Sequence, residues 1–247
     1  MRLLLLVLFT ASLGVALLSA PPRASAQDPD LGVSFRLAVD TDGDGIAACS
    51  TTGGPSTCTL RRDSQFGVDV FLDSLPPELS EYGGFEVELR GSGGIISGEG
   101  AVAWPDGICI AEDRNQGPGK PHRFGCSVMN FGERSTYVGL MATGFFRCTG
   151  DGMVHQEFAE LADPSGQGYS LEGSTLDIRC LPPGDANCDN TANTLDATLI
   201  LQYHARLIPN LACLSVADVN ADGRVNSIDA YLLLFFTASP ILPLPPP

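Results

Sequence analysis

The sequence predicts a mainly β chain, an antiparallel β-sandwich followed by a small unit of two metal-binding loops and two helices. From about residue 31 to residue 180, apolar and polar residues alternate with the two-residue period of half-buried strands, and turn-rich clusters separate the runs. After Pro182-Pro183-Gly184 the period becomes helical, and two similar segments rich in Asp and Asn appear. The expected organisation is a signal peptide, a sandwich domain, a loop-and-helix domain and a Pro-rich tail, at residues 1–26, 27–181, 182–238 and 239–247.

The first 26 residues have the three parts of a secretory signal peptide. Met1-Arg2 is basic, an apolar run follows from Leu3 to Leu18, and Ala24-Ser25-Ala26 is a small-residue cleavage site. The apolar run is shorter than the ~20 residues that usually span a bilayer. We therefore expect a secreted protein, extracellular or at the cell surface, with no membrane span after cleavage.

The charge of the chain disfavours nucleic acid as a partner. Cleavage would remove Arg2 and Arg23 but no acidic residue, which takes the formal net charge from −15 to −17. So acidic a chain repels phosphate backbones, whereas cations such as calcium are natural ligands.

The chain has eight cysteines, and all lie beyond the predicted cleavage site. An even number in an exported protein indicates disulfides, and the absence of any Cys-x-x-Cys pair disfavours zinc. Because short loops close most easily, we expect sequential pairing. The expected pairs are Cys49–Cys58, Cys109–Cys126, Cys148–Cys180 and Cys188–Cys213.

The predicted strands of the first domain are short and alternate cleanly. Each run places its large apolar residues on one face, and no long segment with a 3.6-residue period intervenes. These runs are Val33-Phe35-Leu37-Val39, Phe66-Val68-Val70-Leu72, Phe85-Val87-Leu89 and Leu176-Ile178.

Two loops in the second domain have the ligand spacing of an EF-hand, in which a hard cation takes six to eight oxygens. Oxygen-bearing side chains occupy positions 1, 3, 5 and 12 of each loop, with Asn at position 9. Position 7 offers a backbone carbonyl, so an arginine is acceptable there. Gly223 provides the tight turn at position 6 of the second loop, and Asn190 replaces it in the first. The expected ligands of two calcium ions are Asp185, Asn187, Asp189, Thr191 and Asp196 in the first loop and Asp218, Asn220, Asp222, Arg224 and Asp229 in the second.

The segment from Gly184 to residue 238 resembles the type I dockerin modules of cellulosomal and related extracellular proteins. The pattern Gly-Asp-x-Asn-x-Asp-Gly-x-Val-Asn-Ser-x-Asp is almost fully matched by residues 218–229 and well matched by residues 184–196. The resemblance implies an F-hand pair that folds on two calcium ions and docks onto a cohesin domain. It also implies that positions 10 and 11 of each loop face the partner, which are Thr194, Leu195, Ser227 and Ile228.

This chain departs from the dockerin pattern further along its helices. Where the family often carries Lys or Arg, it has Leu201-Gln202 and Leu234-Phe235 and keeps only Arg206. The second helix is apolar on nearly all sides. Its surplus apolar face would bind a partner or pack on the chain's own sandwich, and the sequence leaves both interpretations open.

The first domain carries weaker signals. Residues 66–76 and 82–89 look similar to the strand pair of cohesin-type and carbohydrate-binding sandwiches. Trp104 is either a sugar-stacking platform or a core residue. The alternating carboxylates Asp40, Asp42 and Asp44 are either a further metal loop or a polar hairpin turn.

No catalytic constellation stands out in the sequence. Glu112, Asp113 and Glu133 are carboxylates of the kind that a glycosidase needs in pairs. The histidines His122, His155 and His204 lie in no nucleophile motif. We therefore predict a non-catalytic binding protein with a cohesin-type partner. The alternatives are a protein whose sandwich binds or hydrolyses polysaccharide, and a self-docked structural unit.

Overall fold

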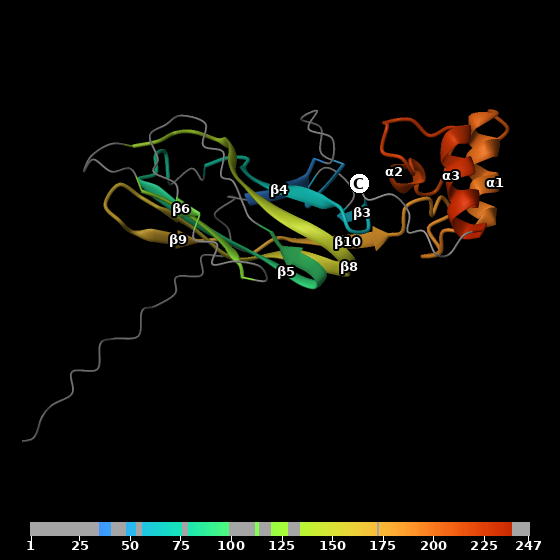
Figure 1. Ribbon diagram of the computed structural model, residues 1–247. Helices are drawn as coiled ribbons and strands as arrows, with labels where there is room; N and C mark the ends of the chain where they lie inside the picture. Colours follow the sequence, from blue (N-terminus) through green and yellow to red (C-terminus); the bar gives the residue numbers. More distant parts are fainter. Residues whose placement is uncertain are drawn as a thin grey trace, which may run out of the picture.

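The protein is described here by a computed structural model, which covers residues 35–40, 48–52, 56–75, 79–98, 112–113, 120–127, 134–171 and 173–238. Within these residues a β-sandwich is followed by a helical module at one end (Figure 1). The predicted signal peptide and Pro-rich tail lie outside the described residues. No helix among the described residues is both long and apolar enough to cross a membrane.

The described strands and helices follow the predicted order of β first and α last. The strands are β1 (Phe35–Val39), β2 (Cys49–Ser50), β3 (Thr57–Arg61), β4 (Gln65–Leu72), β5 (Gly84–Ser97), β6 (Glu112–Asp113), β7 (His122–Ser127), β8 (Gly139–Ala162), β9 (Gly168–Ser170) and β10 (Thr175–Leu181). The helices are α1 (Thr194–His204), α2 (Leu214–Ala217) and α3 (Ser227–Ala238).

The two longest strands, β5 and β8, connect the halves of the sandwich. β8 pairs with β4 through its first part and with β10 and β9 through its later part, while β5 pairs with it from Phe146 to Ala162. The register between β5 and β8 shifts at Gly93/Ile95. There Gly93 has φ +66, and a Cβ on Gly94 would collide with the backbone of Gly150, so only glycines permit so close an approach.

The alternating pattern does predict which side chains are buried. In β4 the residues Phe66, Val68, Val70 and Leu72 are all buried, whereas the residues between them are not. These side chains join those of the other strands in one continuous hydrophobic core. The expected antiparallel sandwich is confirmed, with one exception among the described pairs: β3 and β10 run parallel.

Disulfides join the strands of the sandwich to one another. Cys49–Cys58 links β2 to β3, and Cys148–Cys180 links β8 to β10. Both pairs agree with the sequential pairing expected from loop length. Cys126 is also disulfide-bonded, but Cys109, its expected partner, lies outside the described residues.

In the helical module, α1 and α3 lie side by side, and α2 lies closer to the sandwich (Figure 1). The core of the module is small and separate from that of the sandwich. Cys188–Cys213 ties the start of the module to the segment just before α2. This is the third described pair that matches the expectation.

Candidate metal centre and docking surface

The first loop closes around the carboxylate of its first residue. Asp185 accepts hydrogen bonds from the backbone N–H groups of Asp189 (3.0 Å) and Asn190 (2.8 Å). Asp189 in turn accepts from the N–H of Thr191 at 2.8 Å. These bonds curl the chain so that oxygen-bearing residues at alternate positions lie on the inside of one turn.

The second loop repeats this arrangement bond for bond. Asp218 accepts from the N–H groups of Asp222 (3.2 Å) and Gly223 (2.7 Å), and Asp222 accepts from the N–H of Arg224 at 2.9 Å. Repeated spacing in the sequence has therefore produced repeated geometry.

The left-handed residues also recur at matching positions. Position 6 is left-handed in both loops, at Asn190 (φ 70) and Gly223 (φ 81). Position 4 is left-handed as well, at Cys188 (φ 65) and Ala221 (φ 56). Asn190 thus adopts the conformation for which the second loop uses glycine.

The last carboxylate of each loop is fully buried and connects the loop to its helix. Asp196 accepts from the N–H groups of Asn187 (3.1 Å) and Asn193 (2.9 Å), and Asp229 accepts from that of Asn226 (2.8 Å). Asn193 caps α1 in a reciprocal capping box with Asp196. The loop spacing marks Asn193 and Asn226 only as position-9 residues, although the Asn-x-x-Asp spacing is itself a capping signal.

The electrostatics of the first loop suit a cation. Burial raises the pKa of the Asp196 carboxyl, N–H donation from Asn193 and Asn187 opposes this shift, and the carboxylates of Asp185 and Asp189 reinforce it. Negative charge is therefore concentrated in a desolvated place, which a divalent cation would stabilise.

The oxygen-bearing groups of the two loops form a mixed set of ligands that calcium accepts. The described residues contain no group of three or more His, Cys, Asp or Glu side chains able to hold a metal by themselves. Ligation in either loop would also need Asn side chains and the carbonyls of Thr191 or Arg224, a mixed oxygen set that calcium accepts.

Helices α1 and α3 pack together through small and aliphatic side chains. Their packed contact consists of Ala197 and Ile200 on α1 and Ala230 and Leu233 on α3. Leu195, at the start of α1, is 54% exposed because this contact uses another face of the helix. All four predicted partner-facing residues lie exposed in the first turns of the helices: Thr194, Leu195, Ser227 and Ile228.

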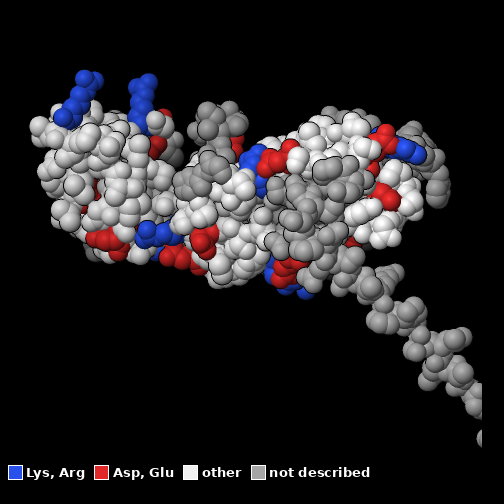
Figure 2. All heavy atoms as spheres, turned by 180° about the vertical axis from the view of Figure 1, so that it is seen from behind, with Lys and Arg blue, Asp and Glu red and all other residues white. Residues whose placement is uncertain are grey.

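Helix α3 does not pack on the sandwich. Ile228, Tyr231, Leu234 and Phe235 are 53%, 63%, 39% and 43% exposed. Among the described residues, the module contacts the sandwich through α2, while these four side chains of α3 stay exposed. Much of the module surface in Figure 2 is uncharged.

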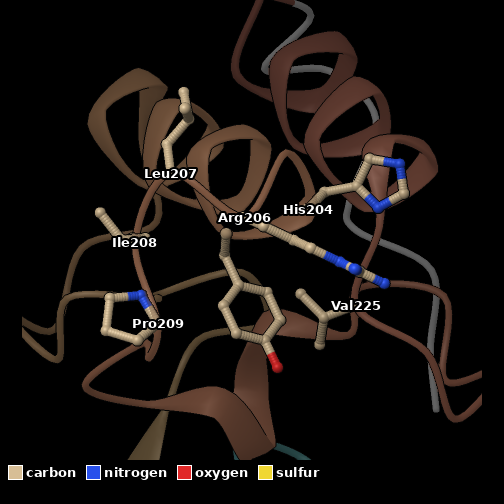
Figure 3. A pocket seen from close by; sticks show the side chains of 7 residues that line it. His204, Arg206, Leu207, Ile208, Pro209 and Val225 are labelled. Atoms are coloured by element: carbon tan, nitrogen blue, oxygen red, sulfur yellow. The ribbon is translucent and has the colours of Figure 1, made fainter.

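A shallow hollow lies where α1 ends beside the second loop. Figure 3 shows the Arg206 side chain extending past Val225, with His204 on one side and Pro209 on the other. Arg206 and Arg224 are the only Lys or Arg residues between residues 182 and 238. Arg206 lines this hollow, and Arg224 directly precedes its lining residue Val225.

Some of the other predicted site residues lie outside the described residues, and the described ones belong to the sandwich. Asp42, Asp44, Trp104 and Glu133 lie outside the described residues, and Asp40 follows directly after β1. Glu112 and Asp113 form β6. His122 is buried, its Nε2 lies 2.7 Å from the carbonyl oxygen of Phe145, and its ring contacts those of Phe124 and Phe146, as befits a core residue.

Comparison with protein families matches residues 183–234 to the dockerin type I domain. The match covers both loops, α1, α2 and most of α3. The helical module is thus a dockerin type I domain, which confirms the resemblance seen in its sequence. Comparison with curated proteins gives no significant match.

Cohesin modules recur among solved structures with a similar fold. One is the cohesin module of a Clostridium perfringens family 33 glycoside hydrolase, at 11% identity and TM-score 0.41, covering 59% of this chain and 96% of that one. Another is a non-cellulosomal cohesin from Archaeoglobus fulgidus, at 15% identity and TM-score 0.35, covering 49% and 86%. The major pilin subunit of Bacillus cereus is also similar, at 8% identity and TM-score 0.39, covering 61% and 40%. These are similarities of fold.

Proposed function

We propose that this is an exported, non-catalytic protein whose dockerin domain binds two calcium ions and docks onto a cohesin-type domain of another protein. Residues 1–26 would be removed as a signal peptide, residues 27–181 would be the displayed domain, and residues 182–238 would be the docking domain ahead of a Pro-rich tail. The observation that carries the proposal is the bond-for-bond repetition of two oxygen-lined loops, each leading into a helix with an exposed first turn.

Calcium would be held by the two sets of ligands predicted from the sequence. In each loop the residues at positions 1, 3, 5 and 12 would offer side-chain oxygens, and Thr191 or Arg224 a carbonyl. Bound calcium would bring together carboxylates that otherwise repel one another. The loops' own residues orient these oxygens through the N–H bonds to Asp185 and Asp218.

The docking surface would be the outward side of α1 and α3. Leu195 and Ile228 are exposed at equivalent places, so the partner would meet apolar side chains flanked by the hydroxyls of Thr194 and Ser227. Large exposed apolar side chains that form a contiguous patch usually mark an interface. α3 would contribute more of the buried area because Tyr231 and Phe235 continue the patch along it.

The test is capture of cohesin domains by the full mature chain, with calcium and with chelator. We expect binding only with calcium, and Ile228→Asp should abolish it without changing the calcium affinity. Thr237→Asp, near the far end of α3 on an exposed residue, is the control for added charge. Calcium-independent capture, or capture that Ile228→Asp leaves intact, would contradict the proposed surface.

A further inference from the structure

The sandwich contacts both calcium loops through the ends of two neighbouring strands. β3 and β10 run parallel, with Arg61 opposite Leu181 at their ends. From β10, the Arg179 guanidinium donates to the carbonyl oxygen of Cys188 at 3.3 Å. From β3, the Arg61 guanidinium donates to that of Asp218 at 3.4 Å. Each strand therefore supplies one arginine to one loop.

Uncharged contacts surround the two arginines. The Ser215 hydroxyl, on α2, donates to the carbonyl oxygen of Thr59 in β3 at 3.1 Å. Leu181 is fully buried with Val216 and Cys213 in a small apolar cluster that belongs to neither of the two larger cores. We call these contacts between β3, β10, α2 and the two loops the junction.

The connection through the junction is short and stiff. Only Pro182, Pro183 and Gly184 separate β10 from Asp185, the first residue of the first loop. Two prolines fix two φ angles, and the N–H of Gly184 donates to the carbonyl oxygen of Val216 at 2.7 Å. A module on so short a connection is held against the ends of β3 and β10.

We propose that Arg61 and Arg179 are positioning residues of the calcium loops, so that the sandwich is the template on which the docking domain takes up calcium. The inference rests on the proposed calcium binding. Cys188 is the fourth residue of the first loop and Asp218 the first residue of the second, so each arginine fixes the backbone beside calcium ligands. A loop that is already ordered loses less conformational freedom when the ion binds, and the apparent affinity rises accordingly.

By thermodynamic linkage, the coupling between the junction contacts and calcium binding is reciprocal. If the junction raises the affinity for calcium, calcium stabilises the junction by the same factor. Calcium would then hold the docking surface more firmly in its direction relative to the sandwich. α1 and α3 would point outward because α2 occupies the side that faces β3.

The test must keep the charge near the loops and change only the donor geometry, because a positive charge itself opposes a nearby cation. In the full mature chain, Arg61→Lys with Arg179→Lys keeps both charges but loses the reach and fork of the guanidinium groups. The control is Arg123→Lys on β7, whose ion pairs with Glu86 (2.9 Å) and Glu88 (3.4 Å) lie within the sandwich. Calcium binding is followed by calorimetry and by helical circular dichroism.

We expect the double variant to need about three- to tenfold more calcium for half-saturation, as befits loss of one or two net hydrogen bonds, and Arg123→Lys to behave as wild type. Wild-type affinity in the double variant would overturn the inference. Ser215→Ala removes one neutral hydrogen bond of the junction and should also raise the calcium concentration needed for half-saturation. This variant tests the inference if the two lysine substitutions disturb folding. Failure of the wild-type chain to bind calcium would instead overturn the proposed function.

Discussion

Replacing Gly184 with alanine should strongly destabilise the docking domain, because this glycine combines an unusual backbone with a crowded position. Its φ is +91, and a Cβ there would lie 3.0 and 3.1 Å from the two δ-methyl carbons of Leu233 and 3.3 Å from Cγ2 of Val219. Both neighbours are fully buried in the core of the module. Alanine would therefore meet backbone strain and overpacking together.

The matched control is Gly223→Ala in the second loop. Gly223 has a similar φ of +81, but nothing lies within 4 Å of its missing Cβ. Gly223→Ala measures the backbone cost alone, which is about 1–2 kcal/mol for a left-handed alanine. Gly184→Ala adds the cost of overpacking, which is about 1–3 kcal/mol. We expect losses of about 2–5 kcal/mol for Gly184→Ala and 1–2 kcal/mol for Gly223→Ala.

Such a loss is large for this domain. A unit of about 55 residues has a typical stability of roughly 3–8 kcal/mol. Thermal unfolding followed at 222 nm reports the module, since all helices of the described residues lie in it. Equal losses in the two variants would refute the overpacking argument. Gly223→Asn should be nearly neutral because Asn190 holds the equivalent conformation in the first loop.

Three further outcomes are expected. Asp229→Ala should abolish partner binding together with calcium uptake in the second loop, whereas Asp196→Ala should leave the second loop able to bind calcium and should only weaken partner binding. Calorimetry should show one bound ion for each variant, and partner capture distinguishes the two. Replacing Cys188 and Cys213 together with serine should cost the module about 3 kcal/mol, the typical value for a loop of this size, measured by chemical denaturation with calcium present. Burial raises the pKa of Asp69, although the hydrogen bond from the Thr143 hydroxyl opposes this shift, so the ionised form of Asp69 costs stability above that pKa. Asp69→Asn should therefore raise the melting temperature of the sandwich at neutral pH, by an amount that shrinks as pH falls through the folded-state pKa, and a gain that is independent of pH would contradict this.

The sequence was sufficient for features that repeat at short range. Alternation along β4 predicts which of its side chains reach the core, and loop length predicts that Cys49 joins Cys58. The two loops follow from spacing because each carboxylate organises N–H groups only a few residues away, as Asp185 and Asp218 do.

Features that depend on contacts between distant segments could not be predicted in this way. Nothing local distinguishes the parallel pairing of β3 with β10 from an antiparallel one. The buried face of α1 was hard to predict because Ala197, which is buried there, is a weak hydrophobic signal. Arg61 precedes Asp218 by 157 residues, so its contact depends on the folded sandwich.

The pairing of β10 has a mechanical consequence for a docked protein. A pull on the helical module enters the sandwich at Leu181, the last residue of β10. Cys180, just inside that end, is covalently joined to Cys148 in β8. Tension therefore passes through a sulfur bridge into the longest described strand before it can peel β10 from its neighbours. A protein anchored by this domain in flowing medium would resist mechanical unfolding of its sandwich from the C-terminal end.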